Sequence, residues 1–228
     1  MVGGRRNVVS ALQDKPLYVQ AYEELKKAIL SGRIRPGEHL SQVKLAEQLN
    51  ISRAPVLDAL ARLATEGLAE HGPRSGYFVK AFTVKDVADI YNVRRALECE
   101  ALEAVFQNAE PEDIRALNDI LLEPYDHLEQ GDMAPYVAAD DAFHTRLVEL
   151  SGNVVLENLL CQLKDQTQLV RVMVAVSPQR VKRAAKEHLE ILDLLLEGNL
   201  PAAREMLSYH IDSVKDEVIA GLRKKGQA

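Results

Sequence analysis

Residues 41–63, SQVKLAEQLNISRAPVLDALARL, constrain the fold most strongly, because they predict two short helices joined by a sharp turn. Ser41 is suited to cap the first helix, and Asn50 to end it, since asparagine tolerates the left-handed backbone of a helix C-terminus. Ser52 is placed to cap the second helix, in which Pro55 falls in the first turn, where a backbone nitrogen has no helical partner. The apolar residues that would pack the two helices together are Leu45, Ala46, Leu49, Val56, Ala59, Leu60 and Leu63. This pattern is the plan of a helix-turn-helix, a DNA-reading element.

The flanking residues decide between this interpretation and an ordinary pair of core helices, which periodicity alone would also fit. A helix is expected from about residue 16 to 31, and residues 68–71 and 76–80 predict two short strands around a turn at 72–75. A helix-turn-helix followed by a hairpin with a basic tip makes a winged helix. We therefore expect a mainly α chain that begins with a winged helix-turn-helix domain.

The charge distribution agrees with a basic DNA-binding domain followed by an acidic domain that does not contact DNA. Residues 1–80 carry 12 Lys and Arg against 8 Asp and Glu, whereas residues 81–228 carry 16 against 26. A basic unit suits contact with phosphate, and an acidic one does not. The 47% apolar content is enough for a buried core in one or two domains. No run approaches the 18 apolar residues of a membrane-spanning helix. Cys99 and Cys161 lie in helical patterns and are expected to be buried thiols, which suits a reducing compartment. A cytoplasmic protein is therefore expected.

After the hairpin, helical patterns alone are found. Thr83 and Asp86 resemble a capping box that would start the first of them, and prolines and glycines mark the breaks between the others. Six helices with short connections predict an antiparallel all-α bundle. Their expected spans are 84–107, 111–130, 134–150, 154–176, 178–197 and 201–222.

Polar residues stand on the apolar stripes of three of these helices. Asp140 and His144 lie one helical turn apart on the inward stripe of 134–150, and His188 and His210 occupy the centres of the stripes of the last two helices. One divalent metal would satisfy all four groups, and a carboxylate with three imidazoles suits zinc, nickel, manganese or iron. The alternative is three separate core histidines that bond to backbone or tyrosine.

Two resemblances sharpen these expectations. Residues 16–68 contain IxxGxIxPGxxL and SRAPVLDAL segments that resemble the N-terminal domain of GntR-type bacterial transcription regulators. Residues 140–153 and 187–211 resemble the FadR C-terminal domain (FCD) of one branch of those regulators. Its metal-binding group has a DxxxH pattern followed by two histidines 22 residues apart. The resemblance implies that Asp140, His144, His188 and His210 hold the metal.

The residues and the resemblance together give an expected domain plan and a set of expected DNA contacts. The plan is a flexible arm at 1–14, a DNA-binding domain at 15–80, and a metal-binding, effector-binding and dimerisation domain at 81–228. The expected DNA-contacting residues are Ser41, Lys44, Ser52, Arg53, Ala54, Leu57, Arg74, Ser75 and Gly76. Relatives usually read SRTPVREAL in the second helix, so Ala54 and Leu57 depart from the pattern, as does Val43 in the first. Arg53 is the basic residue kept at the groove-facing start of the helix, and we expect it to contact guanine or phosphate.

The function expected from these features is a homodimeric regulator that binds operator DNA and responds to a small carboxylate effector beside the metal. Arg94 lies on the inward stripe of 84–107, where its guanidinium could hold the carboxylate, or could form a structural ion pair with Glu98 one turn on. Two other readings stay open from sequence alone. One is a metal-dependent enzyme of the helical-bundle type, and the other is a constitutive DNA-binding protein with a structural metal.

Overall fold

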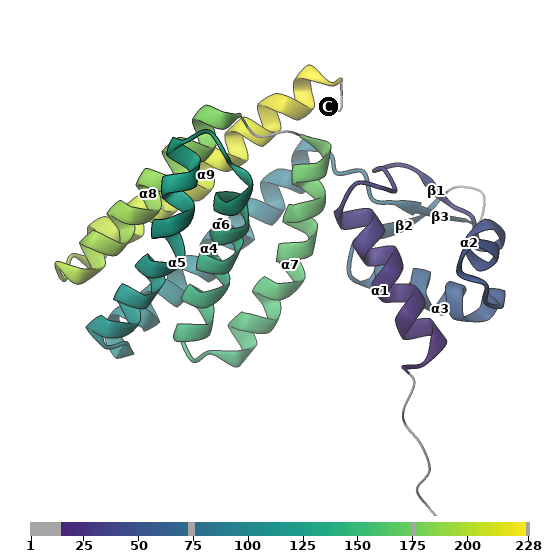
Figure 1. Cartoon of the computed structure of the whole chain (residues 1–228), viewed down its shortest axis with the longest axis horizontal. Coiled ribbons are helices and arrows are strands. Elements are labelled where there is room, and N and C mark those ends of the chain that lie inside the picture. Colours follow the sequence, from purple (N-terminus) through teal and green to yellow (C-terminus); the bar gives the residue numbers. More distant parts are fainter. Residues whose placement is uncertain (1–14, 73–75, 175–176, 227–228) are drawn as a thin grey trace, which may run out of the picture. The chain divides into compact units, whose positions relative to one another are not determined.

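The computed structural model describes residues 15–72, 76–174 and 177–226, and it divides the chain into two compact units at the bond between Lys80 and Ala81 (Figure 1). Within the described residues the chain is mainly helical, with nine helices and one three-stranded sheet, so the predicted fold class is confirmed. The arm expected at residues 1–14 and the wing-tip residues Arg74 and Ser75 lie outside the described residues.

The first unit is a winged helix-turn-helix. Its elements are α1 (Leu17–Leu30), β1 (His39–Leu40), α2 (Gln42–Leu49), α3 (Arg53–Thr65), β2 (Ala69–Gly72) and β3 (Gly76–Val79). The sheet has the order β1-β3-β2 with antiparallel pairs, and the β2–β3 hairpin forms the wing. The two-residue strand β1 was not predicted, because so short a segment has no periodicity of its own.

The turn between α2 and α3 follows the sequence expectation closely. The Ser41 hydroxyl accepts the Lys44 N–H, and Asn50 adopts φ 53°, the left-handed conformation expected for the end of α2. Ser52 occupies the N-cap position of α3, but its side chain makes no cap hydrogen bond, so that part of the prediction was wrong. One face of α3 is buried against α1 and α2 through Val56, Ala59, Leu60 and Leu63, which holds the opposite face outward.

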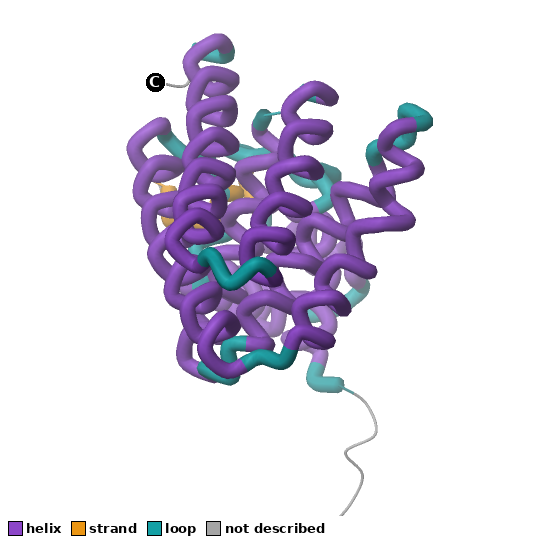
Figure 2. The backbone as a smooth tube through the Cα atoms, turned by 90° about the vertical axis from the view of Figure 1, so that its left-hand side faces the viewer, coloured by secondary structure: helices purple, strands orange, loops and turns teal. Residues whose placement is uncertain are grey.

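The second unit is an antiparallel helical bundle (Figure 2). Its helices are α4 (Val84–Asn108), α5 (Pro111–Glu129), α6 (Ala134–Leu150), α7 (Val154–Met173), α8 (Pro178–Leu196) and α9 (Leu200–Lys224), which agree with the predicted spans within three residues. The capping box of Thr83 and Asp86 begins α4, as expected. The long helix α4 packs against α6, α7 and α9, while α8 packs against α5 and α9. Three helices that carry the expected metal ligands, α6, α8 and α9, therefore surround a common interior with α4.

The C-terminal end of α7 is fixed by contacts from two other parts of this unit. The Phe82 backbone N–H donates to the Met173 sulfur over 3.4 Å, and the Lys225 ammonium donates to the Met173 carbonyl over 2.6 Å. At the next residue, a Cβ added to Gly221 of α9 would lie 2.2 Å from Val174 Cγ1. Gly221 is thus required by the close approach of α9 to the end of α7.

Two side chains lie differently from the sequence expectation. Cys99 is buried, but Cys161 is exposed, because it sits one step around α7 from the buried Leu160. Val137, expected on the inward stripe of α6, is 39% exposed. No helix in the described parts of the chain is long and apolar enough to cross a lipid bilayer.

Candidate functional site

Four side chains that are far apart in sequence converge inside the bundle. Asp140 and His144 project from α6, His188 from α8 and His210 from α9, and one donor atom of each lies within 4.8 Å of the others. The three histidines are buried and Asp140 is half-buried. The sequence prediction that these residues lie together is thus realised in the structure.

The donor atoms are spaced as ligands around a small centre. The Nε2 atoms of His188 and His210 are 3.1 Å apart, while Asp140 Oδ1 lies 3.7 Å from His188 Nε2 and 3.9 Å from His144 Nε2. Ligands at about 2.0–2.2 Å from one metal are separated by roughly 3 to 4 Å from each other. These three spacings match the ligands of a single cation, and all four donor atoms lie within 4.8 Å of one another.

Each histidine is oriented by an oxygen atom at its other ring nitrogen. Nδ1 of His144 lies 2.6 Å from Glu98 Oε2, and Nδ1 of His210 lies 2.8 Å from Glu187 Oε2. Nδ1 of His188 lies 2.9 Å from the Tyr136 hydroxyl. When Nδ1–H donates to these oxygens, the Nε2 lone pair of every ring points to the centre, which is the usual support of a histidine metal ligand.

The buried Nε2 atom of His144 tests whether the group fits a cation. Among the described residues it has no hydrogen-bond partner, although it is buried. An unpaired buried polar atom costs about 1–3 kcal/mol, so native structures rarely retain one without a reason. A cation at the centre would satisfy this nitrogen together with the other three donors.

The electrostatics of the site keep its donors in the states that a metal requires. Burial by itself would raise the pKa of Asp140, but Arg171 and the three histidines lower it well below its usual range, so the carboxylate stays charged. Burial lowers the pKa of His188 and of His210, and both imidazoles therefore stay neutral. Although burial opposes it, Arg94 and His144 lower the pKa of Glu98 to about 2.

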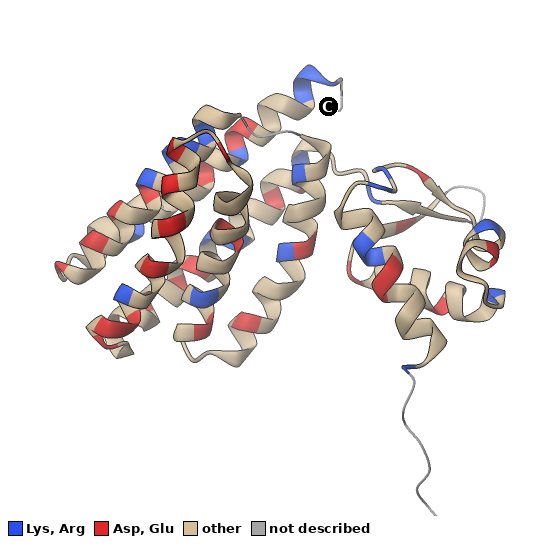
Figure 3. Ribbon diagram, in the orientation of Figure 1, with Lys and Arg blue, Asp and Glu red and all other residues tan. Residues whose placement is uncertain are grey.

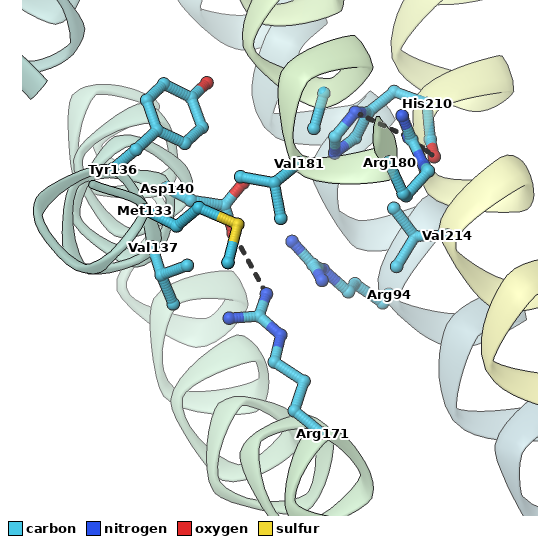
Figure 4. Close-up of a pocket in the computed structure, with 11 residues that line it drawn as sticks. Arg94, Met133, Tyr136, Val137, Asp140, Arg171, Arg180, Val181, His210 and Val214 are labelled. Carbon is cyan, nitrogen blue, oxygen red and sulfur yellow. Dashed lines mark hydrogen bonds and ion pairs between the residues drawn. The ribbon is translucent and has the colours of Figure 1, made fainter. Parts of the chain in front are cut away.

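A cavity of about 270 Å³ adjoins the cluster (Figure 4). Arg94, Arg171 and Arg180 reach it from three different helices, and Figure 4 shows the first two pointing toward Asp140. Asp140 and His210 face the same space. The remaining lining residues are Met133, Tyr136, Val137, Val181, Ala184 and Val214. A ligand in this cavity would meet the metal ligands and the guanidinium groups at once.

Arg94 makes the structural ion pair that was one of its two expected roles, and it lies beside the cavity that the other role would require. Its Nε donates to Glu98 over 2.5 Å, so the structural ion pair is present, and the same side chain lines the cavity. Sequence reasoning missed the roles of Glu187, Arg171 and Arg180. Glu187 is the residue next to His188 but bonds to His210, and Arg171 lies on a helix that contributes no ligand. A charged residue on an otherwise apolar helix face could have indicated these roles. Arg180 is such a residue, and it is only 1% exposed.

The residues expected to contact DNA lie on α2, α3 and the wing. Lys44, Arg53 and Ala54 are exposed, and Leu57 is 43% exposed although it is apolar. Ser41, Ser52 and Gly76 lie at the starts of α2, α3 and β3 respectively. The start of α3 therefore has one basic residue beside small and apolar ones. Figure 3 colours the basic and acidic residues along the ribbon of both units.

The winged helix-turn-helix, followed in the sequence by a helical bundle, defines the class of protein as a DNA-binding transcriptional regulator. Residues 17–79 match the family of bacterial regulatory proteins named gntR, and residues 89–213 match the FCD domain. The chain belongs to the GntR family and carries an FCD domain as its second unit.

Individual relatives agree with this assignment. The chain is 31% identical over 198 residues to the uncharacterized HTH-type transcriptional regulator YdhC of Bacillus subtilis, covering 86% of this chain and 88% of that protein. It resembles the structure of McbR/YncC of E. coli with a TM-score of 0.72 at 23% identity, over 90% of this chain and 98% of that one. The metal-free FCD domain of TM0439, a transcriptional regulator, aligns with a TM-score of 0.54 at 24% identity, over 63% of this chain and 99% of that one. Because the relatives are transcriptional regulators, the metal-dependent enzyme left open by the sequence is set aside.

Proposed function

We propose that this regulator binds one divalent metal per chain through Asp140, His144, His188 and His210, and that a small carboxylate bound beside the metal changes its affinity for operator DNA. The observation that carries the proposal is the convergence of four donor atoms within 4.8 Å around a buried imidazole nitrogen with no other partner in the described structure. Zinc suits this donor set best, and nickel, manganese or iron also fit it.

Bound at this centre, a divalent metal would supply positive charge and open coordination positions for an anion. The residues of the chain do the rest of the work. Asp140, held by Arg171 over 3.0 Å, would contribute the anionic ligand, while Glu98, Tyr136 and Glu187 hold the imidazole rings in place. Arg94 would hold the effector's carboxylate, because its side chain faces the cavity next to the cluster.

At the DNA, we propose that α3 enters the major groove with Arg53 reaching a guanine or a phosphate, supported by Lys44 from α2. Ser41, Ser52, Ala54, Leu57, Arg74, Ser75 and Gly76 complete the proposed contact set. A homodimer would place two such units on two half-sites of an operator. An exposed apolar strip on α7, formed by Val154, Val155 and Leu159, supports association with a second copy.

The experiment uses purified full-length protein and DNA sites selected by it from a random-sequence pool. Metal content is measured by mass spectrometry, and DNA affinity is then measured by fluorescence anisotropy with metal, with chelator, and with a panel of organic acids. An acid that acts through the metal site should change DNA affinity about 5- to 150-fold, the range of ordinary allosteric coupling. The same acid should do nothing after chelation.

His188→Ala is the informative variant, and His127→Ala is its matched control, because His127 is an exposed histidine of the same bundle. The first should lose the metal and the acid response, and the second should keep both. Stoichiometric metal in His188→Ala would contradict the assigned ligands. A metal that raises Tm while no acid alters DNA binding would leave a structural metal and overturn the effector half of the proposal.

A further inference from the structure

The charges around the cavity restrict what kind of acid it can hold. Every arginine that lines the cavity is already paired with carboxylates of the bundle. The pairs are Arg94 with Glu98, Arg171 with Asp140 and Asp141, and Arg180 with Glu187. The cavity therefore contains guanidinium groups without containing an excess of positive charge.

Counting formal charges makes this quantitative. Three arginines face four carboxylates in these pairs, a net charge of −1 with the histidines neutral. A divalent cation bound at the cluster changes the net charge to +1. One carboxylate then neutralises the site, whereas a second would leave an excess negative charge beside carboxylates whose arginine partners are already in use.

The hydrogen-bonding capacity of the three arginines also indicates a single carboxylate. Arg171 uses both terminal nitrogens on Asp140 and Asp141, and Arg180 uses both on Glu187. Arg94 uses Nε for Glu98, and within the described structure its two terminal nitrogens have no hydrogen-bond partner. The edge of Arg94 is thus open to a ligand and suits one carboxylate, whereas Arg180 has a single unpaired Nε–H, which cannot form a bidentate pair.

Apart from His210 and from Tyr136, whose hydroxyl lies 2.9 Å from His188 Nδ1, the uncharged lining of the cavity is apolar. It is formed by Met133, Val137, Val181, Ala184 and Val214, from α6 and its N-terminal approach, α8 and α9. None of these side chains can neutralise or hydrogen-bond a second carboxylate. A cavity of about 150 Å³ holds benzene, so the 270 Å³ here has room for on the order of ten non-hydrogen atoms.

Resting on the proposed function, we infer that the effector is a monocarboxylate with a short uncharged tail. Its carboxylate binds beside Arg94 and the metal ligands, and its tail lies against Val137, Val181 and Val214. Dicarboxylates of the same length are discriminated against by the charge balance of the site. The effector class is therefore set by this chain's ion pairs, and not by the metal alone.

Calorimetric titration of the zinc-loaded full-length protein tests the inference with acids matched in length. Butanoate is compared with succinate, and pentanoate with glutarate. Each monocarboxylate should bind at least about tenfold more tightly than its dicarboxylate partner, since the second carboxylate has no cation left to pair with. Protein stripped of metal gives the background.

Val137→Lys supplies a gain-of-function test, because Val137 lines the cavity but is exposed enough to accept an ammonium group. The variant should shift the preference toward succinate by about tenfold. Leu122→Lys is the control, since Leu122 is 48% exposed on α5 and does not line the cavity. It should leave the preference unchanged.

The outcomes separate this inference from the proposed function. Succinate or glutarate binding as tightly as its monocarboxylate partner would overturn the single-charge inference and leave a carboxylate effector standing. If Val137→Lys keeps the wild-type preference for butanoate over succinate, the effector's tail does not lie beside Val137. If no acid of either series binds to protein with confirmed zinc content, the inference and the effector proposal both fall.

Discussion

The contribution of the Tyr136–His188 hydrogen bond to metal affinity can be measured with Tyr136→Phe, which removes a single oxygen atom. The Tyr136 hydroxyl lies 2.9 Å from His188 Nδ1, and the side chain is 1% exposed. Burial raises the pKa of this phenol, so it is neutral at ordinary pH. Tyr136→Phe keeps the ring and its packing but removes the group that receives the His188 N–H.

The expected cost follows from this geometry. With Nε2 committed to the metal, the Nδ1–H of His188 would be left buried without an acceptor, at about 1–3 kcal/mol. Loss of an outer partner of a metal ligand typically weakens metal binding 10- to 100-fold, or about 1.4–2.7 kcal/mol, which agrees with that cost. We therefore expect the zinc dissociation constant to rise by this factor in competition with a chelating dye.

Tyr91→Phe is the matched control. Tyr91 is equally buried in the same bundle, but its hydroxyl has no hydrogen-bond partner in the described structure. This variant should bind zinc within about twofold of the wild type, because no satisfied bond is lost. Unchanged zinc affinity in Tyr136→Phe, or an equal loss in both variants, would refute the role assigned to Tyr136.

Three further substitutions examine other parts of the chain. Arg53→Ala should weaken binding to a selected DNA site by about 1–3 kcal/mol in fluorescence anisotropy, and undiminished binding would contradict the assignment. Gly221→Ala should lower the free energy of unfolding in urea by about 1–3 kcal/mol because its Cβ would overlap Val174, and a gain in stability would show that the approach is looser than described. Although burial opposes it, the Tyr22 and Lys26 bonds lower the pKa of Glu66, so its stabilisation is present above about pH 4.3 and disappears as the pH falls through the folded pKa. Glu66→Gln should therefore flatten the acid side of a stability–pH curve, and an unchanged slope would count against the pairing.

Local signals in the sequence predicted most elements of the fold. The capping box at Thr83 and the left-handed turn at Asn50 depend on neighbouring residues only, and both are found in the structure. The ligands could be predicted because Asp140 and His144 are one helical turn apart, and because His188 and His210 interrupt apolar stripes. Such positions are defined by helical periodicity before any tertiary packing is known.

The rest of the site depends on how the helices pack, and periodicity carries no information about that. Glu187 bonds to His210 on α9, and Glu98 on α4 bonds to His144 on α6, pairings that depend on crossing angles and axial offsets. Arg171 belongs to a helix without a ligand, so no motif includes it. Val137 was expected to be buried because it lies on the apolar stripe of α6. The stripe gives only the side of the helix on which a residue lies, and on that side Val137 faces a cavity that is open to solvent.

The positions of Arg171 and Met173 on α7 have a mechanical consequence. Arg171 grips Asp140 and Asp141, and two residues further Met173 receives the N–H of Phe82, at the start of the unit just after the wing. These two side chains are about 3 Å apart along the axis of one rigid helix, so neither can slide without the other. Any axial shift of α7 that moves Arg171 away from Asp140 therefore also moves the sulfur that accepts the Phe82 N–H, within the same unit.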